Sequence, residues 1–136
     1  MVTFRNYYYF CSALNERMMK EITAEYMACP IRNVIDRFGD KWSLLILYGL
    51  WQHNPQSLRF GELHKLMTDC SQKMLSQTLK RLEKNHLVSR KQYAEIPPRV
   101  EYTLTDLGCS LMPAIAPLLQ WSLDHFSEVT DGKVIV

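Results

Sequence analysis

The sequence predicts a mainly α-helical protein with one small antiparallel β-hairpin. Three observations support this fold class. Apolar residues recur at helical spacing over most of the 136 residues. Two segments, 87–93 and 100–104, instead alternate at period two, as strands do. The composition, with 47% hydrophobic and 22% charged residues, is typical of a folded soluble protein with a genuine core.

An N-terminal extension, residues 1–28, is expected to contribute one helix. Ser12 is placed to cap a helix over about 13–27. Its apolar residues recur every four positions, at Leu14, Met18, Ile22 and Tyr26. Such a stripe needs a partner, either in the chain's own core or on a second subunit. We expect this extension to be associated with a dimer interface.

Two helices are expected next. Pro30 suits the first position of a helix, because the N–H that proline lacks has no partner there, and Gly39 is expected to end this helix. Asp40 can cap the following helix. The core of that helix, LLILYGLW, is hydrophobic on nearly all sides and should be the buried centre of the domain. The sequence HNP at residues 53–55 stops it.

A helix-turn-helix unit is predicted between residues 58 and 86. Residues 58–60 can form a very short strand, the spacing of apolar residues in GELHKLM indicates a short helix, and residues 68–70 form a turn. Ser71 can then cap a second helix by accepting a hydrogen bond from its first turn. Two short helices joined by a few residues are the layout of this motif.

The helix after Ser71 has two different faces at an advance of about 100° per residue. The face that should be buried consists of Leu75, Thr78, Leu79, Leu82 and His86. The opposite face is cationic and rich in hydrogen-bond donors, and it consists of Lys73, Ser76, Gln77, Lys80 and Lys84. That face suits the DNA major groove, where lysines meet phosphates and Gln or Ser can read base edges. A helix with an ordinary solvated face is the alternative.

The two alternating segments form a β-hairpin beside the helix-turn-helix unit, which makes a winged helix. Pro97 and Pro98 stiffen the loop of this wing, and Arg99 lies near its tip. Together with Arg90 and Lys91, Arg99 is placed to contact backbone phosphates or a minor groove.

Positive charge is concentrated in this part of the chain. The window 57–99 holds nine basic and four acidic residues, a net charge of +5, whereas the rest of the chain carries −3. The net charge of the whole chain, +2, is too small to argue for nucleic acid by itself. The uneven distribution of charge along the chain is typical of a surface that binds a polyanion. It weakens the alternative that the cationic helix face is merely solvated.

Residues 105–136 are expected to form a C-terminal dimerisation helix and a tail. Thr105 can cap a helix that runs to about Phe126. Its apolar residues cover too wide an arc for the core of one subunit, which indicates a dimer interface. Pro113 and Pro117 each remove a helix hydrogen bond, so a kink or break is expected there.

Membrane, metal and enzyme chemistry are not expected. The longest apolar run, residues 44–51, is far shorter than the ~20 residues that span a bilayer, and the N-terminus lacks a signal peptide's apolar region. We therefore expect a cytoplasmic protein. The four cysteines form no CxxC pair and the four histidines lack metal-ligand spacing. No phosphate loop or nucleophile–base pair is visible, so no cofactor and no enzymatic activity are predicted.

Four blocks of the sequence resemble the HxlR-type bacterial transcriptional regulators, winged-helix proteins akin to the MarR group. The blocks are CPIRNVIDRFGDKW, LRFGELHKLM, SQKMLSQTLKRLEKNHLVSR and EIPPRVEYTLTDLGCSL. The resemblance covers about residues 29–126. It implies a homodimer that binds an operator through one winged helix-turn-helix, residues 29–104, per subunit. The long segment before Cys29 and the additional Pro117 depart from the family pattern.

The predicted contacts with double-stranded DNA follow from these elements. Residues at the start of the second helix are assigned to base edges: Gln72, Lys73, Ser76 and Gln77, with Ser71 beside them. Other basic residues are assigned to phosphates or to the wing contact: Arg59, Lys80, Lys84, Arg90 and Arg99. For each residue a solvated side chain is the alternative. Two helices related by a twofold axis should read a near-palindrome with half-sites about 10 bp apart, or a multiple of that spacing.

Cys29 is the candidate thiol sensor. It lies at or just before a helix N-terminus and close to Arg32, and both influences favour the reactive thiolate. In the resembling family a cysteine directly before this proline is recurrent, and some members use it to sense oxidants or electrophiles. The alternative is a small buried hydrophobic residue. Three further cysteines are interpreted as packing residues, namely Cys11, Cys70 and Cys109.

The predicted function is sequence-specific transcription regulation by a homodimer on a near-palindromic operator, as repressor or activator. The response to an oxidant or small electrophile would pass through Cys29. A winged-helix module that docks protein without specific DNA binding is the alternative.

Overall fold

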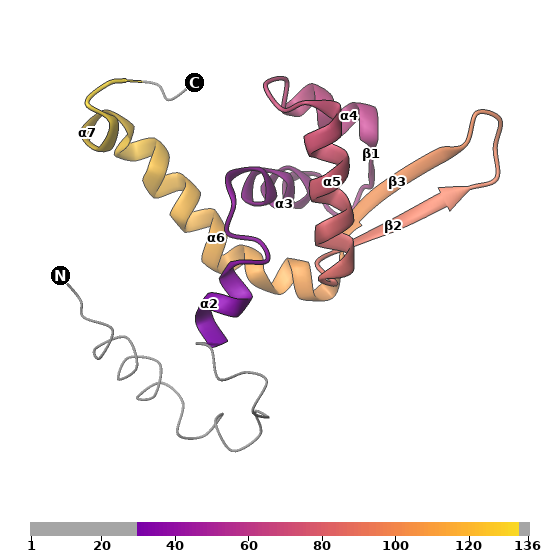
Figure 1. The fold of residues 1–136 in the computed structure, drawn as a ribbon, viewed down its shortest axis with the longest axis horizontal. Coiled ribbons are helices and arrows are strands. Elements are labelled where there is room, and N and C mark those ends of the chain that lie inside the picture. Colours follow the sequence, from indigo (N-terminus) through magenta and orange to yellow (C-terminus); the bar gives the residue numbers. More distant parts are fainter. Residues whose placement is uncertain (1–29, 134–136) are drawn as a thin grey trace, which may run out of the picture. The chain divides into compact units, whose positions relative to one another are not determined.

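The computed structural model describes residues 30–133, so the predicted helix over 13–27 and Cys29 lie outside the described part. The chain divides after Asp40 into two compact units, which are described separately. Its elements are α2 (Pro30–Ile35), α3 (Lys41–His53), β1 (Leu58–Arg59), α4 (Phe60–Leu66), α5 (Gln72–Lys84), β2 (Val88–Tyr93), β3 (Arg99–Leu104), α6 (Asp106–Asp124) and α7 (Phe126–Thr130) (Figure 1). The predicted mainly helical fold class is confirmed.

Helix α2 begins at Pro30, as predicted, but it ends at Ile35 rather than at Gly39. A turn follows through Phe38, and the Gly39 N–H donates a hydrogen bond of 2.6 Å to the Ile35 carbonyl oxygen. A Cβ at Gly39 would lie 2.7 Å from that oxygen. Glycine is needed here because the backbone passes so closely, and the helix ends earlier than its apolar spacing predicted.

Helix α3 lies at the centre of the second unit, where it contacts α4, α5, α6 and β3. Ile46, Leu47 and Leu50 are fully buried on one face. The other face is open, since Leu45 is 43% and Trp51 39% exposed. The predicted central position of this helix is confirmed, but its neighbours among residues 41–133 bury only one of its faces.

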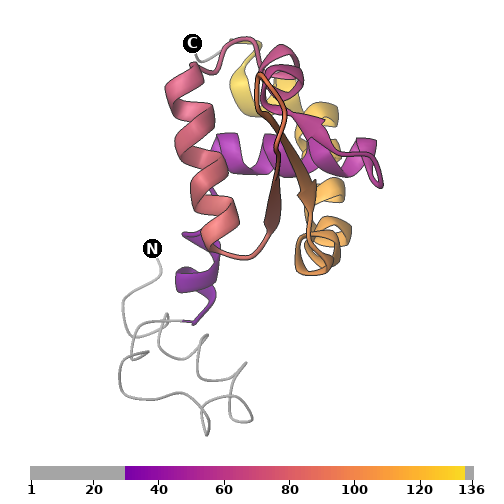
Figure 2. The same cartoon turned by 90° about the vertical axis from the view of Figure 1, so that its right-hand side faces the viewer.

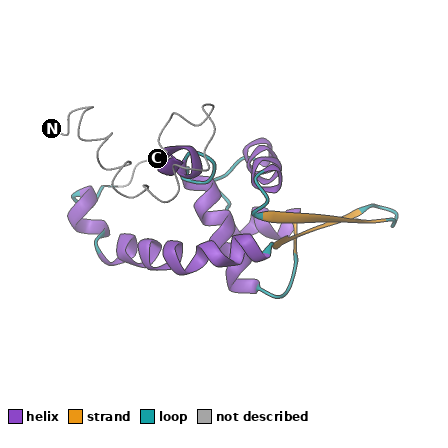
Figure 3. Cartoon of the chain, turned by 90° about the horizontal axis from the view of Figure 1, so that it is seen from below, coloured by secondary structure: helices purple, strands orange, loops and turns teal. Residues whose placement is uncertain are grey.

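The predicted hairpin is confirmed and gains a third strand. The sheet is antiparallel with the order β1-β3-β2, and β2 pairs with β3 from Val88 opposite Leu104 to Tyr93 opposite Arg99. The short strand β1 pairs Leu58 with Tyr102 on the outer side of β3. Figure 3 shows the hairpin extending away from the helices of its unit. The wing is thus attached to the helix-turn-helix through β1 as well as through its own strands.

Helix α5 follows its predicted amphipathic pattern with one exception. Ser71 caps the helix, its Oγ accepting a 3.1 Å hydrogen bond from the Met74 N–H. Four predicted core residues are at most 1% exposed, namely Leu75, Thr78, Leu79 and Leu82. His86 does not join them, because the helix ends at Lys84 and His86 is exposed with a left-handed φ of 63°. That turn leads the chain into β2, which contacts α5 (Figure 2).

Helix α6 begins where predicted and is not broken by its prolines. The Thr105 hydroxyl accepts a hydrogen bond of 3.0 Å from the Gly108 N–H and donates one of 2.6 Å to the His86 carbonyl oxygen. Pro113 and Pro117 both lie inside the helix, which bends in Figure 1 without interruption. Both prolines are on the exposed side, where the missing hydrogen bonds leave carbonyl groups that water can satisfy. No helix within residues 30–133 has the length and apolar character to cross a membrane.

Replacing Gly108 tests the packing between α6 and the segment before β2. A Cβ at Gly108 would collide with the Leu87 carbonyl oxygen and approach Leu104 Cδ2 to 3.2 Å. Gly108→Ala should lower the free energy of unfolding by roughly 1–3 kcal/mol, as overpacking does. Gly61→Ala is the control, because no atom lies within 4 Å of its Cβ position. Urea unfolding of both variants measures the difference, and equal effects would contradict this packing.

Candidate nucleic-acid interface

The exposed face of α5 carries the residues predicted to reach base edges and phosphates. Ser71, Gln72, Lys73, Gln77, Lys80 and Lys84 are exposed, and Ser76 is half-buried. Within residues 30–133, no carboxylate forms an ion pair with Lys73, Lys80 or Lys84. The buried residues hold the opposite face against α3. The helix therefore presents unneutralised cations and amide groups from a fixed backbone.

Side-chain hydrogen bonds brace α5 within the helix-turn-helix unit. Arg81 Nη2 donates to Ser43 Oγ of α3 at 3.0 Å. His64 Nε2 lies 3.0 Å from the Cys70 carbonyl oxygen and joins α4 to the turn, and the His64 ring stacks on Phe60 at 6.5 Å between centroids. These contacts fix the angle at which α5 leaves the turn.

Cys70 is part of the core of this turn. It is 2% exposed, and its thiol lies 3.6 Å from the Ser71 carbonyl oxygen. Burial raises the pKa of the Cys70 thiol, and the neighbouring Asp69 charge raises it further. A thiol with a raised pKa is a poor nucleophile. The prediction that Cys70 is a packing residue is confirmed, and the half-buried Cys109 is also free.

The wing has two kinds of basic residue. Arg90 and Lys91 are exposed on β2, and Lys91 Nζ lies 4.9 Å from the centre of the Tyr93 ring. Arg99, by contrast, is engaged inside the wing. Its guanidinium lies 3.3 Å from Glu95 and 3.5 Å from Glu101, and it stacks over the Tyr93 ring at 4.0 Å. A phosphate would have to compete with two carboxylates for Arg99, whose DNA contact stays a prediction.

Glu101 joins the wing to the segment before β1. Its carboxylate accepts a hydrogen bond of 2.7 Å from the Ser57 hydroxyl. That bond is the main reason why the pKa of Glu101 is lowered; a hydrogen bond from Tyr93 and the charges of Arg99 and Arg59 act in the same direction, against the opposite effect of burial. The sequence alone does not predict this role, because Ser57 and Glu101 are far apart in the chain and only the β1–β3 register brings them together.

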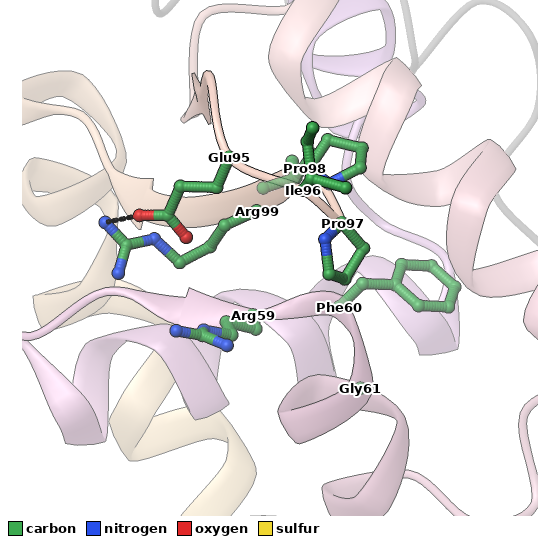
Figure 4. Close-up of a pocket in the computed structure, with 9 residues that line it drawn as sticks. Arg59, Phe60, Gly61, Glu95, Ile96, Pro97, Pro98 and Arg99 are labelled. Atoms are coloured by element: carbon green, nitrogen blue, oxygen red, sulfur yellow. Dashed lines mark ion pairs between the residues drawn. The ribbon is translucent and has the colours of Figure 1, made fainter.

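A hollow of about 390 Å³ separates the wing loop from the start of α4. Its lining comes from Arg59, Phe60 and Gly61 on one side and from the loop and β3 on the other, namely Glu95, Ile96, Pro97, Pro98, Arg99 and Val100. Figure 4 shows the Glu95–Arg99 pair across the hollow from Arg59. The Arg59 N–H donates to Glu62 Oε2 at 2.7 Å, which caps α4. No carboxylate of residues 30–133 pairs with the exposed Arg59 guanidinium.

The C-terminal helices expose a large amount of apolar surface. Leu107, Leu118 and Trp121 share one side of α6 at helical spacing and are 56%, 52% and 51% exposed. The buried residues Met112 and Ile115 lie on a different side. Large exposed apolar patches mark interaction sites in folded proteins. This is the surface from which the sequence predicted a dimer interface.

Metal-ligand chemistry has no basis in the described part of the chain. Within residues 30–133, no three His, Cys, Asp or Glu side chains gather at a position that could hold an ion. The arrangement instead combines a cationic helix face, a basic hairpin and a fixed turn. This is the geometry of a winged helix-turn-helix.

Comparison with known proteins identifies the family. Residues 37–130 match the model of the HxlR-like helix-turn-helix family. The HTH-type transcriptional regulator YkvN of Bacillus subtilis is 44% identical over 94 residues, which cover 69% of this chain and 77% of YkvN. The match with the family model spans the predicted helix-turn-helix, the wing and the C-terminal helices.

Solved structures of winged-helix regulators share the fold. The redox regulator HypR in its oxidised form has 31% identity and a TM-score of 0.64, over 71% of this chain and 96% of HypR. Diamide-treated YodB from B. subtilis has 33% identity and a TM-score of 0.59, over 73% of this chain and 96% of YodB. The resemblance inferred from the four sequence blocks is confirmed, and the chain belongs to the HxlR-like helix-turn-helix family of transcriptional regulators.

Proposed function

We propose that this regulator binds a specific near-palindromic operator as a homodimer, with α5 of each subunit in a major groove. The observation that carries this proposal is the exposed face of α5, on which Gln72, Ser76 and Gln77 lie between lysines that pair with no carboxylate of residues 30–133. The buried side chains of α5 hold its backbone in place beneath this face. DNA binding therefore requires no backbone rearrangement before the exposed side chains can make contacts.

The proposed contacts divide into two groups. Gln72, Lys73, Ser76 and Gln77 on the first turns of α5 meet base edges, since the N-terminal part of a recognition helix enters the groove most deeply. Backbone phosphates are met by the remaining basic residues, namely Arg59, Lys80, Lys84, Arg90 and Arg99. Arg59 suits this role because it is exposed beside the hollow, between helix and wing.

Lys73→Ala should weaken operator binding without unfolding the protein. The loss of one good base contact costs about 1–3 kcal/mol, so the affinity for the operator should fall by roughly tenfold or more. A gel-shift titration on DNA selected from a random library measures this loss. Lys133→Ala removes an equal charge from the exposed C-terminal end and should bind as the parent protein does. If Lys73→Ala binds with unchanged affinity, Lys73 is not a DNA contact.

The same titration at several salt concentrations separates DNA binding from the alternative of a protein-docking module. Each phosphate that the protein neutralises contributes about 0.9 to the slope of log affinity against log salt. A regulator with several phosphate contacts has a steep slope and prefers one sequence. A weak slope without sequence preference would favour the alternative.

The homodimer is proposed from the exposed side of α6. A twofold arrangement of two recognition helices requires a self-complementary surface. Leu107, Leu118 and Trp121 supply such an exposed apolar surface. The terminal extension, residues 1–28, is proposed to add to this interface.

Leu118→Asp should convert the dimer into a monomer, because the new carboxylate would have to be desolvated in the interface. Gln120→Glu is the control, since Gln120 is exposed on another side of α6. Light scattering after gel filtration measures the mass of each variant. If both variants have the same mass as the parent protein, Leu118 does not lie in the dimer interface.

Cys29 is proposed to link DNA binding to an oxidant or electrophile. Two of the structurally similar proteins are a redox regulator and a regulator crystallised after diamide treatment, which supports a thiol response in this fold. Its position before Pro30 at the start of α2 favours the thiolate. Cys70 is excluded by its burial and raised pKa.

Diamide treatment should change the operator affinity of the parent protein and of Cys109→Ser, and it should leave Cys29→Ser unchanged. The reason is that oxidation requires an accessible thiolate, which the burial and raised pKa of Cys70 deny to that thiol. Gel-shift titration before and after treatment measures the response, and added dithiothreitol should reverse it. An equal response from Cys29→Ser would assign the response to another thiol.

A further inference from the structure

The tip of the wing is apolar. Ile96 is 103% exposed, so its side chain makes no packing contact. It is followed by Pro97 and Pro98 (Figure 4). Residues 94–98 are all exposed. Isolated exposed apolar residues are common on protein surfaces. This one is distinguished by its place at the end of a basic hairpin that projects from the helices (Figure 3).

The tip also carries no uncompensated charge. Its one acidic residue, Glu95, pairs with Arg99 at 3.3 Å, which neutralises a carboxylate that would otherwise repel DNA. The exposed cations Arg90 and Lys91 lie further back on β2, opposite Tyr102 and Glu101. The wing therefore offers cations along its length and an apolar side chain at its end.

The loop that carries Ile96 is held in place before any contact is made. The two prolines restrict the backbone φ after Ile96. Arg99 stacks on Tyr93 and is paired with Glu95 and Glu101, which ties both ends of the loop together. Because the loop is already ordered, inserting its tip into a groove costs little conformational entropy.

We propose that Ile96 is a specificity-determining residue that enters the minor groove at the outer edge of each half-site and favours A·T over G·C pairs there. This inference rests on the proposed operator binding. An apolar side chain gains nothing from phosphates, whereas apolar residues do insert into minor grooves. At a G·C pair the guanine 2-amino group projects into that groove, and an apolar contact would block and desolvate this donor. A·T pairs present no such group.

The test uses the full chain and a selected operator whose outer positions are A·T, G·C or inosine·cytosine. Inosine·cytosine keeps the major-groove pattern of G·C but lacks the 2-amino group. The parent protein should bind the A·T and inosine operators alike and the G·C operator about tenfold more weakly, the usual cost of a wrong base pair. Equally weak binding of the inosine and G·C operators would overturn the proposal.

Ile96→Ser is the informative variant, and its exposure means that folding should not suffer. It should lose most of the discrimination between inosine and G·C while keeping the salt slope of the parent, because no phosphate contact is removed. Ile96→Arg should instead steepen that slope by about 0.9. Unchanged discrimination in Ile96→Ser, with sequence-specific binding intact, would overturn this inference alone and leave the wing tip to another partner. Absence of any sequence-specific binding by the parent protein would overturn the proposed function as well.

Discussion

The burial of one face of α5 is the constraint on which the rest of the second unit depends. Leu75, Leu79 and Leu82 fill the space beside α3, and the Arg81–Ser43 hydrogen bond sets the helix against its neighbour. Truncating any one of these leucines would remove about 2–5 kcal/mol, a large part of the stability of a small domain. Because the leucine face is buried, the opposite, cationic face of α5 points to solvent. The same packing therefore stabilises the domain and exposes the cationic face.

The wing is organised by a second set of interactions, which are polar. Glu101 receives the Ser57 hydroxyl and lies beside Arg99, which in turn reaches Glu95 and stacks on Tyr93. This cluster attaches β1, β2 and β3 to one another away from the hydrophobic core. Carboxylates inside the protein partly neutralise the positive charge of Arg99. This basic residue therefore contributes less charge to the surface than the sequence alone suggests. Helix and wing thereby present different chemistry: amide groups and lysines on α5, and an apolar tip on the hairpin.

The spacing of apolar residues predicted the helix-turn-helix and the hairpin, and residue type predicted the helix caps at Ser71 and Thr105. These features depend on the local sequence. Periodicity failed where contacts between distant parts of the chain determine the structure. His86 matched the buried face of α5, but the chain leaves the helix before it through a left-handed turn. α3 was expected to be the buried centre of the domain, and it is central, yet its neighbours among the described residues leave Trp51 exposed. The Ser57–Glu101 hydrogen bond and the hollow beside Arg59 could not be predicted, because both depend on the pairing of β1 with β3.

The most direct test of the central claim is a hydroxyl-radical footprint of the full chain on its selected operator. Two winged helices related by a twofold axis should protect two symmetric sets of positions, with centres about 10 bp apart or a multiple of that spacing. Weaker protection in the minor grooves at the outer edges should accompany them. Uniform protection without symmetry, or none at salt concentrations at which the protein remains folded, would contradict the assignment of α5 as the helix that reads DNA.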